Sequence, residues 1–340
     1  MATKTHARVL IIGGSVAGLT LANAFEQTGI DYLLLEQWHE IAPDVGASIA
    51  IFPNGARILD QLGCYDQSIR LLDGADAFDL IQTKEEDGGV ISFVPNGYTP
   101  FFTDRQMVIR TLYDNLKDKT RILMSQKVVR VEQTADTVKV STKVGETYSA
   151  EVLVGADGIH SKVRREMWRL AANKLPGYFQ SGEGESVRTQ YCCIFGISKP
   201  IDKFPKQCSY YVRGNGHSYL CSIGPGNRIY WFLFKKLKKP VYGLYEKIPR
   251  YDEAELEALV SEHVNDPIGE GMCFGDLYRM RKVATLQALP EFNLIGGQGG
   301  NSAIEDAAVL TNELLKLLES ESSETSHLTT SSLENAFQRM

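Results

Sequence analysis

The stretch Arg8–Glu36, RVLIIGGSVAGLTLANAFEQTGIDYLLLE, predicts the fold of the region around it. The apolar run Val9–Ile12 is typical of a buried strand, and Gly13–Gly18 follows it as a glycine-rich turn. Apolar residues at helical spacing come next, and a second apolar run, Tyr32–Leu35, ends on Glu36. A dinucleotide needs this order, because the turn brings bare N–H groups to a pyrophosphate and the helix N-terminus adds partial positive charge.

The glycine turn matches the dinucleotide pattern G-x-G-x-x-G at its first and third places. Gly13 and Gly18 fill those places, and Ser15, whose hydroxyl is small, stands at the second. Glu36 follows Gly18 by eighteen residues, where a carboxylate accepts hydrogen bonds from ribose hydroxyls. A flexible turn in an ordinary parallel α/β domain is the alternative. We expect Gly13, Gly14, Ser15 and Gly18 to cradle a dinucleotide and Glu36 to hold its ribose.

Size, charge and cysteine usage limit the class of protein. The 340 residues exceed the usual size of one core, so two domains are expected, and 43% hydrophobic residues suffice to fill them. The net charge of −6, without a basic block, argues against a nucleic-acid partner. The six cysteines are scattered, with no C-x-x-C pair or histidine cluster at ligand spacing, so we expect no metal and no disulfide.

The N-terminus, MATKTHAR, is polar and passes directly into the first strand, which leaves no room for a signal peptide. No apolar run approaches the length that spans a bilayer. We therefore expect a cytoplasmic protein without a membrane span, while peripheral association with a membrane stays open.

Small side chains dominate the run Gly46–Ala56, GASIAIFPNGA. We expect a flat ligand to lie against this backbone, near Ala50, although a tightly packed crossing of loop and sheet explains the composition equally well. A helix is expected at Arg57–Leu62. Two alternating segments between Asp79 and Val94 predict a hairpin.

The segment Thr103–Asp114 predicts a helix with one buried apolar face and with Asp104 as its N-cap. Arg105, in the first turn, either reaches a phosphate or the edge of a cofactor, or is simply solvated.

Three β-like runs, Lys127–Glu132, Thr137–Thr142 and Glu151–Val154, predict a meander that covers one face of the nucleotide-binding sheet. The last run enters Gly155–Arg164, GADGIHSKVR, where an acid stands between glycines at the end of a strand. From spacing alone, Asp157 is best explained as a turn residue or a helix cap.

Together these segments resemble the FAD-dependent monooxygenases of the para-hydroxybenzoate hydroxylase type. The likeness is greatest to the fungal branch that epoxidises or hydroxylates prenylated and polyketide intermediates of secondary metabolism. It is carried by the first glycine turn with Glu36 and by GASIAIFPNGARILDQLG (Gly46–Gly63), TDRQMVIRTLYD (Thr103–Asp114), GADGIHSKVR (Gly155–Arg164) and GGQGGNSAIEDAA (Gly296–Ala308). These segments extend over nearly the whole chain, and the last two in this order are specific to the family.

The resemblance implies FAD as the cofactor, NADPH or NADH as the reductant, and O2 with a small apolar organic molecule as substrates. By the family pattern, Glu36 holds the adenosine ribose, Arg105 lies along the FAD, and Asp157 belongs to a loop that handles both FAD and NAD(P)H. The activity that the resemblance implies is the epoxidation or hydroxylation of a terpenoid, meroterpenoid or aromatic polyketide intermediate.

Gly299, Gly300 and Asn301 are expected to form a second cradle at the start of a helix over Ser302–Leu318. The dipole of such a helix stabilises the negative charge of reduced flavin. Between the two cradles lies an aromatic-rich middle that suits a large apolar ligand. There we expect Tyr219 to be the catalytic phenol that donates a hydrogen bond to the substrate or to the activated oxygen.

The resemblance implies an α/β fold, with a Rossmann-like FAD-binding domain that carries a β-meander and a mostly antiparallel-sheet substrate domain. Residues 1–75, 98–168 and 276–318 are expected to form the discontinuous FAD-binding domain, and residues 76–97 and 169–275 the substrate domain. Residues 319–340 are rich in Ser, Thr and Glu at first, which predicts a disordered tail followed by the start of a shortened helix.

One departure from the family pattern motivates a second hypothesis. Family members carry a strand ending in Gly-Asp before the second glycine motif, whereas here Leu286–Ile295 runs directly into the glycines. The chain would then be a catalytically impaired or non-catalytic flavoprotein remnant. A third hypothesis, an NAD-dependent dehydrogenase, shares the first turn but leaves the Gly155–Arg164 and Gly296–Ala308 motifs unexplained.

Overall fold

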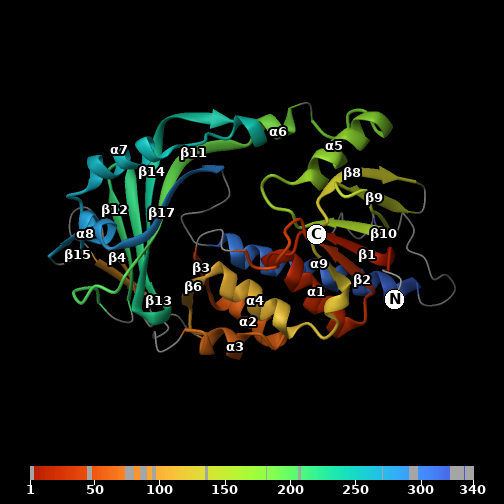
Figure 1. Ribbon diagram of the computed structural model, residues 1–340, viewed down its shortest axis with the longest axis horizontal. Coiled ribbons are helices and arrows are strands. Elements are labelled where there is room, and N and C mark those ends of the chain that lie inside the picture. Colours follow the sequence, from red (N-terminus) through yellow and green to blue (C-terminus); the bar gives the residue numbers. More distant parts are fainter. Residues whose placement is uncertain are drawn as a thin grey trace.

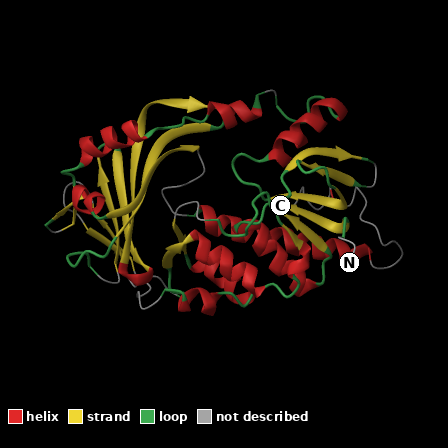
Figure 2. Ribbon diagram, viewed as in Figure 1, coloured by secondary structure: helices red, strands yellow, loops and turns green. Residues whose placement is uncertain are grey.

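The structure is a computed structural model of the chain. It describes residues 4–43, 48–72, 80–84, 90–93, 97–134, 137–180, 182–205, 208–269, 271–290, 298–321 and 333. Figure 1 shows a large sheet at one end of the long axis, a group of helices in the centre and a second sheet at the other end. Figure 2 shows that further helices cover the outer side of the large sheet.

The smaller of these sheets has the strand order β7-β2-β1-β10-β9-β8. Its strands are β1 (His6–Ile12), β2 (Tyr32–Leu35), β7 (Ile122–Leu123), β8 (Val128–Gln133), β9 (Val138–Thr142) and β10 (Thr147–Gly155). β1 pairs in parallel with both β2 and β10, and β2 pairs in parallel with β7. The predicted order of strand, glycine turn, helix and strand is therefore confirmed.

Both faces of this sheet are buried around the second half of β1, which explains why Val9–Ile12 are all apolar instead of alternating. Val9 and Ile11 pack toward the central helices, whereas Leu10 and Ile12 belong to a separate apolar cluster on the opposite face. That second face is covered in part by Leu170 of α5 (Lys162–Lys174).

The predicted meander extends the sheet instead of covering its face. β9 pairs antiparallel with β10 and with β8, so the three strands continue the parallel part edge to edge. The hydrophobic alternation of a strand predicts a half-buried surface but does not determine which neighbour pairs with its edge.

The large sheet has the order β17-β11-β14-β13-β12-β4-β5. Its strands are β4 (Leu80–Lys84), β5 (Val90–Phe93), β11 (Arg188–Ser198), β12 (Cys208–Gly214), β13 (His217–Gly224), β14 (Arg228–Tyr242) and β17 (Arg281–Pro290). All neighbours are antiparallel except β12 and β4. The mostly antiparallel second sheet and the hairpin of β4 with β5 are thus confirmed; the turn of that hairpin lies outside the described residues.

The predicted domain boundary at residue 276 differs from the structure. β17 pairs with β11 along nearly its full length, so residues 281–290 belong to the large sheet and not to the small sheet of the predicted FAD-binding domain. The helix α8 (Phe274–Arg279) packs in the same apolar cluster. The strand pattern of β17 is equally compatible with either sheet, and only its long-range pairing decides between them.

The remaining elements are helices and two short strand pairs. The helices are α1 (Val16–Thr28), α2 (Pro53–Gln61), α3 (Tyr65–Arg70), α4 (Arg105–Asn115), α6 (Glu183–Ser186), α7 (Glu253–His263) and α9 (Gly299–Glu321), with 3-10 turns η1 (Lys119–Arg121), η2 (Pro225–Asn227) and η3 (Tyr245–Lys247). β3 (Ser48–Ile51) pairs with β6 (Phe101–Asp104), and β15 (Pro267–Gly269) pairs with β16 (Met272–Cys273). The helices predicted at Arg57–Leu62, Thr103–Asp114 and Ser302–Leu318 are present, and α9 begins before and ends after its predicted range. The predicted helix start at the C-terminal end falls almost wholly outside the described residues. Residues 322–332, most of the predicted tail, lie outside the described residues.

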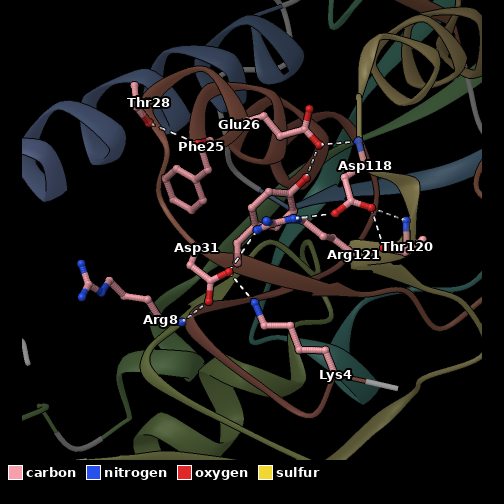
Figure 3. Close-up of polar contacts among 10 residues, drawn as sticks. Lys4, Arg8, Phe25, Glu26, Thr28, Asp31, Asp118, Thr120 and Arg121 are labelled. Atoms are coloured by element: carbon pink, nitrogen blue, oxygen red, sulfur yellow. Dashed lines mark hydrogen bonds and ion pairs between the residues drawn. The ribbon is translucent and has the colours of Figure 1, made fainter. Parts of the chain in front are cut away.

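The end of the small sheet away from the glycine turn is closed by polar contacts (Figure 3). Asp31 accepts hydrogen bonds from Lys4, from the backbone N–H of Arg8 and from Arg121 Nη1. Glu26 of α1 accepts hydrogen bonds from two backbone N–H groups of the loop before η1, including that of Asp118 at 3.0 Å. These contacts fix the loop that leads from α4 back to the sheet.

A buried carboxylate, Glu166, attaches α5 to β8. Its oxygens accept hydrogen bonds from Lys162 at 2.9 Å, Arg169 at 2.8 Å and the backbone N–H of Val131 at 3.0 Å. Burial by itself raises the pKa of Glu166, but the hydrogen bonds from Arg169, Val131 and Lys162 outweigh it and lower the pKa from 4.5 to about 2. The depressed pKa means that ionised Glu166 stabilises the folded state.

We expect Glu166→Gln to lower the free energy of unfolding at pH 7 by an amount on the order of 3 kcal/mol. Because the pKa is lowered on folding, this contribution is complete above pH 4.5 and is lost as the pH falls to about 2. Urea unfolding at several pH values measures the difference, which should disappear at the acid end. Glu132→Gln, at an exposed position of β8, is the matched control. A difference that does not depend on pH would contradict this explanation.

Among the described helices, none is at once long enough and apolar enough to traverse a bilayer.

Candidate functional site

The turn between β1 and α1 is built so closely that side chains are excluded from it. Gly13 has φ +108°, and a Cβ on it would lie 2.5 Å from the carbonyl oxygen of Ala156. A Cβ on Gly18 would overlap the carbonyl oxygen of Gly13. The backbone therefore has the tight, bare conformation that a dinucleotide cradle requires.

Glu36, at the end of β2, is buried and held in place by the backbone. Its Oε2 accepts a hydrogen bond from the Gly14 N–H at 2.6 Å, and its Oε1 accepts one from the Trp38 N–H at 2.9 Å. A carboxylate in this position is oriented before any ligand arrives, and it retains lone pairs for hydroxyl donors.

The second glycine segment reaches the same place from the other end of the chain. Gly299 and Gly300 begin α9, and a Cβ on Gly300 would overlap the side chain of Ile49 in β3. Asn301 next to them is fully buried: its Nδ2 donates to the carbonyl of Ala50 and its Oδ1 accepts from the Phe52 N–H, both at 2.9 Å.

A cavity of about 640 Å³ lies between the two glycine segments. Its lining includes Gly13, Gly14, Ser15, Glu36, Arg105, Asp157, Gly299 and Gly300. Eight of the predicted cofactor-binding positions thus meet around one space, although they come from four distant parts of the sequence. Gly18, Ala50 and Asn301 lie behind the wall, where they shape the turn or anchor α9.

Arg105 and Asp157 have contacts that the sequence left open. Arg105 Nη2 donates to Ser15 Oγ at 3.1 Å; burial lowers the pKa of Arg105, and the negative charge of Glu36 partly offsets this.

Asp157 accepts hydrogen bonds from the backbone N–H groups of Lys162 at 2.6 Å and Val163 at 3.1 Å. Asp157 therefore does serve the N-terminus of α5, as its spacing predicts, while it also lies at the cavity.

Asp104 precedes α4 as predicted, but its side chain makes no cap. It accepts hydrogen bonds from Arg228 Nη2 at 2.7 Å and from the Tyr230 hydroxyl at 2.9 Å. The prediction of a capping role is wrong, because partners 124 and 126 residues away take the carboxylate. This contact joins β6 to the large sheet.

Tyr219 lies elsewhere. It is 1% exposed, packs against Phe274 of α8, and its hydroxyl donates to Asp266 Oδ2 at 2.8 Å. It belongs to the apolar cluster beneath α7 and α8 and is not among the residues that line the cavity. This placement corrects the expectation that its phenol faces a substrate. Successive residues of a strand point to opposite faces of the sheet, and the sequence does not tell which of the two faces packs under the helices.

The residue after it, Leu220, is on the other face, where sequence reasoning missed an apolar surface. Leu220 and Phe232 are half-buried there, beside the buried Phe195 and Tyr230 and against Phe102 of β6. The alternation within HSYLCSIG (His217–Gly224) was the available signal, but it does not tell which face turns toward the glycine segments.

Two histidines meet the carboxylate that Tyr219 contacts. Donor atoms of His217, His263 and Asp266 all lie within 4.8 Å of one another, a grouping that their sequence spacing did not reveal. Lys235 Nζ lies 2.9 Å from His263 Nε2, and its positive charge opposes a metal cation at this position. The cluster therefore acts as a hydrogen-bonding centre of the fold.

The cavity fits an extended flavin dinucleotide by three features of the chain. Positions that exclude a Cβ form its two ends, a buried carboxylate and a guanidinium stand in its wall, and its volume lies within the range of small-molecule sites, about 300–1,000 Å³. The N-termini of α1 and α9 both begin at its lining, where N–H groups and helix dipoles favour phosphate and reduced flavin.

Comparison with known proteins gives the same cofactor. The FAD binding domain family matches residues 6–178. The chain is 38% identical to the FAD-dependent monooxygenase andE of Emericella variicolor, over 92% of this chain and 71% of that protein. It is 37% identical to the FAD-dependent monooxygenase spyC of Aspergillus fumigatus, over 94% and 72%. The crystal structure of Klebsiella pneumoniae HpxO with FAD and uric acid shares the fold, with a TM-score of 0.68 and 20% identity over 96% of this chain and 82% of that one.

Proposed function

The chain belongs to the FAD-binding-domain family of FAD-dependent monooxygenases, and from this premise we propose that it uses NAD(P)H and O2 to epoxidise or hydroxylate an apolar intermediate of fungal secondary metabolism. The substrate class is a terpenoid, a meroterpenoid or an aromatic polyketide. The observation that carries the proposal is the meeting of two glycine-lined helix starts at one cavity.

The residues at the cavity have separate parts in holding FAD. The N–H groups of Ser15 and Val16 at the start of α1 suit the pyrophosphate, and Glu36, held by the Gly14 N–H, suits the adenosine ribose. Arg105, held by Ser15, supplies a positive charge along the cofactor, and Gly299 with Gly300 offers the N-terminus of α9. FAD, when bound, supplies the two-electron redox chemistry and the activation of O2.

The substrate surface proposed here is the half-buried apolar face around Leu220 and Phe232. Its aromatic rings pack closely, with centroids of Phe195 and Phe232 5.2 Å apart and those of Phe102 and Phe232 6.4 Å apart. Such a face binds an apolar molecule and excludes water from the reacting atoms. Asp104 connects the cavity side to this face through Arg228 and Tyr230 and so sets their relative position.

The comparisons do not favour the alternative of a non-catalytic remnant. Relatives named as monooxygenases align with more than nine tenths of the chain. The segment that motivated the alternative is Leu286–Ile295, which runs into the second glycine motif; its first five residues end β17, and residues 291–297 lie outside the described residues. The dehydrogenase hypothesis is not supported, because the family match is to an FAD-binding domain.

Anaerobic reduction followed by aeration tests the proposal. We expect the purified protein to be yellow, to lose its flavin absorbance when NADPH or NADH is added without O2, and to recover it in air. A panel of prenylated phenols and aromatic polyketides should then include a compound that gains one oxygen atom, as measured by mass spectrometry. Flavin that neither nucleotide reduces would refute the proposed use of NAD(P)H.

A further inference from the structure

A second cavity, of about 410 Å³, adjoins the first. The two share Lys127, Val128, His160 and Lys162 in their linings. The second cavity extends from there between β8, α5 and the η3 region, and its size is within the range of small-molecule sites.

Positive charge dominates this second cavity. Four basic side chains, those of Lys127, Lys162, Arg165 and Arg250, line it together with a single carboxylate, Glu246. The chain as a whole carries a net charge of −6, so this local excess does not follow from composition. A space lined in this way attracts an anion.

Two of the four cations are already neutralised within the protein. Arg165 Nη2 donates to both carboxylate oxygens of Glu246, at 2.8 and 3.0 Å, and Lys162 Nζ pairs with Glu166 at 2.9 Å. The side chains of Lys127 and Arg250 make no hydrogen bond or ion pair with any residue that the structure describes. The hydrogen bond from Arg165 lowers the pKa of Glu246 and the charge of Arg250 contributes to this, but the N–H donors of Lys127 and Arg250 remain available to a ligand.

Tyr245 gives this cavity a fixed wall. It has φ +61°, in the left-handed region that costs a non-glycine residue about 1–2 kcal/mol. Its hydroxyl donates to the carbonyl of Ser161 at 3.0 Å, and the Arg165 guanidinium lies 3.6 Å from its ring centroid. The tyrosine therefore holds Arg165 and Glu246 against α5, and Arg250 is left facing the cavity.

We propose that the second cavity binds the 2′-phosphate of NADPH, with Arg250 as its principal ligand, and that the enzyme consequently prefers NADPH to NADH. This inference rests on the proposed use of a reduced nicotinamide nucleotide. The 2′-phosphate of NADPH is a monoester that carries nearly two negative charges at pH 7. NADH has only a neutral hydroxyl at the same position. Arginine is the side chain best suited to bind phosphate through paired N–H donors. The shared wall places this phosphate beside the flavin cavity, where a reductant has to bind.

Calorimetric titration of the flavin-loaded protein with NADPH, NADH and 2′,5′-ADP tests the proposal. In Arg250→Ala we expect the dissociation constants of NADPH and 2′,5′-ADP to rise about tenfold, which corresponds to one lost charge-assisted hydrogen bond, and that of NADH to stay constant. Arg250→Lys should recover part of the loss. The FAD content should not change, because Arg250 lines only the second cavity.

Lys143→Ala is the charge-matched control. Lys143 is an exposed residue of the β9–β10 turn that lines neither cavity. An equal loss of NADPH and NADH binding in Arg250→Ala, unchanged 2′,5′-ADP binding, or a loss of FAD would each overturn the proposal. Binding of 2′,5′-ADP requires no flavin reduction, so it decides the role of the cavity even where neither nucleotide proves to be a reductant.

Discussion

Gly18→Ala is expected to yield a protein that purifies without flavin. The added Cβ would overlap the carbonyl oxygen of Gly13, which is backbone and cannot rotate away. Relief of the overlap requires the turn to open, and the N–H groups of Ser15 and Val16 then move away from the cavity. Loss of two hydrogen bonds to phosphate corresponds to a loss of FAD affinity of about 100-fold or more.

Flavin absorbance relative to protein, followed by titration with added FAD, measures this effect. Far-UV circular dichroism shows whether the sheets remain folded. Gly14→Ala should give an intermediate loss, because its Cβ would meet side-chain atoms and not backbone, Ile41 Cδ1 at 2.8 Å and Glu36 Oε2 at 3.1 Å.

Gly29→Ala is the matched control at the other end of the same helix. Gly29 has φ +73° and no atom within 4 Å of an added Cβ, so the change should cost only about 1 kcal/mol of stability and no flavin. Full flavin content in Gly18→Ala would show that the turn tolerates a side chain and would remove the basis for assigning it to FAD.

Trp231→Ala is expected to cause the largest loss of stability among single core substitutions, about 3–5 kcal/mol. Trp231 is completely buried in β14, and its ring packs edge-on against Phe274 with centroids 5.2 Å apart. Its Nε1 donates to Ser198 Oγ at 2.7 Å. Gly196 lies directly opposite on β11 and leaves the space that the indole fills. Truncation therefore leaves a cavity and a buried hydroxyl without its donor.

Thermal unfolding monitored by circular dichroism should show a midpoint lower by about 4–7 °C. Trp231→Phe keeps an aromatic ring but loses the donor to Ser198, and it should cost only about 1–2 kcal/mol. Equal destabilisation by the two substitutions would mean that the hydrogen bond, and not the packed volume, stabilises this part of the sheet.

The cofactor-binding half of the molecule could be predicted because its signals are local. Gly13, Gly18 and Glu36 lie within one strand–helix–strand unit, where the steric limits of the turn and the length of the helix fix their relative positions. The other predicted positions that line the same cavity, among them Arg105 and Gly299, come from distant segments and were predicted from the family resemblance. Asp157 was explained in the same way, as a residue that binds the N–H groups at the start of the following helix.

The errors arose where partners are distant in sequence. Asp104 has the position of a cap, yet Arg228 and Tyr230 bind it. We predicted Tyr219 as the catalytic phenol, but its side chain lies on the face of the large sheet under α7 and α8, and the neighbouring Leu220 lies on the face that packs against β6. Alternation along a strand identifies two faces but does not tell where each one points. β17 joined the large sheet because of its pairing with β11.

By itself, the sequence determined the nucleotide turn, the acid that follows it and the presence of a second glycine-lined helix start, because each depends on backbone sterics within a few residues. Only the tertiary structure decided that Tyr219 turns into the buried cluster beneath α7 and α8 while Leu220 lies on the opposite face of the sheet, and that Lys127 and Arg250 line one cavity beside the flavin site. These arrangements depend on how sheets pair and pack across hundreds of residues, and no local pattern encodes that choice.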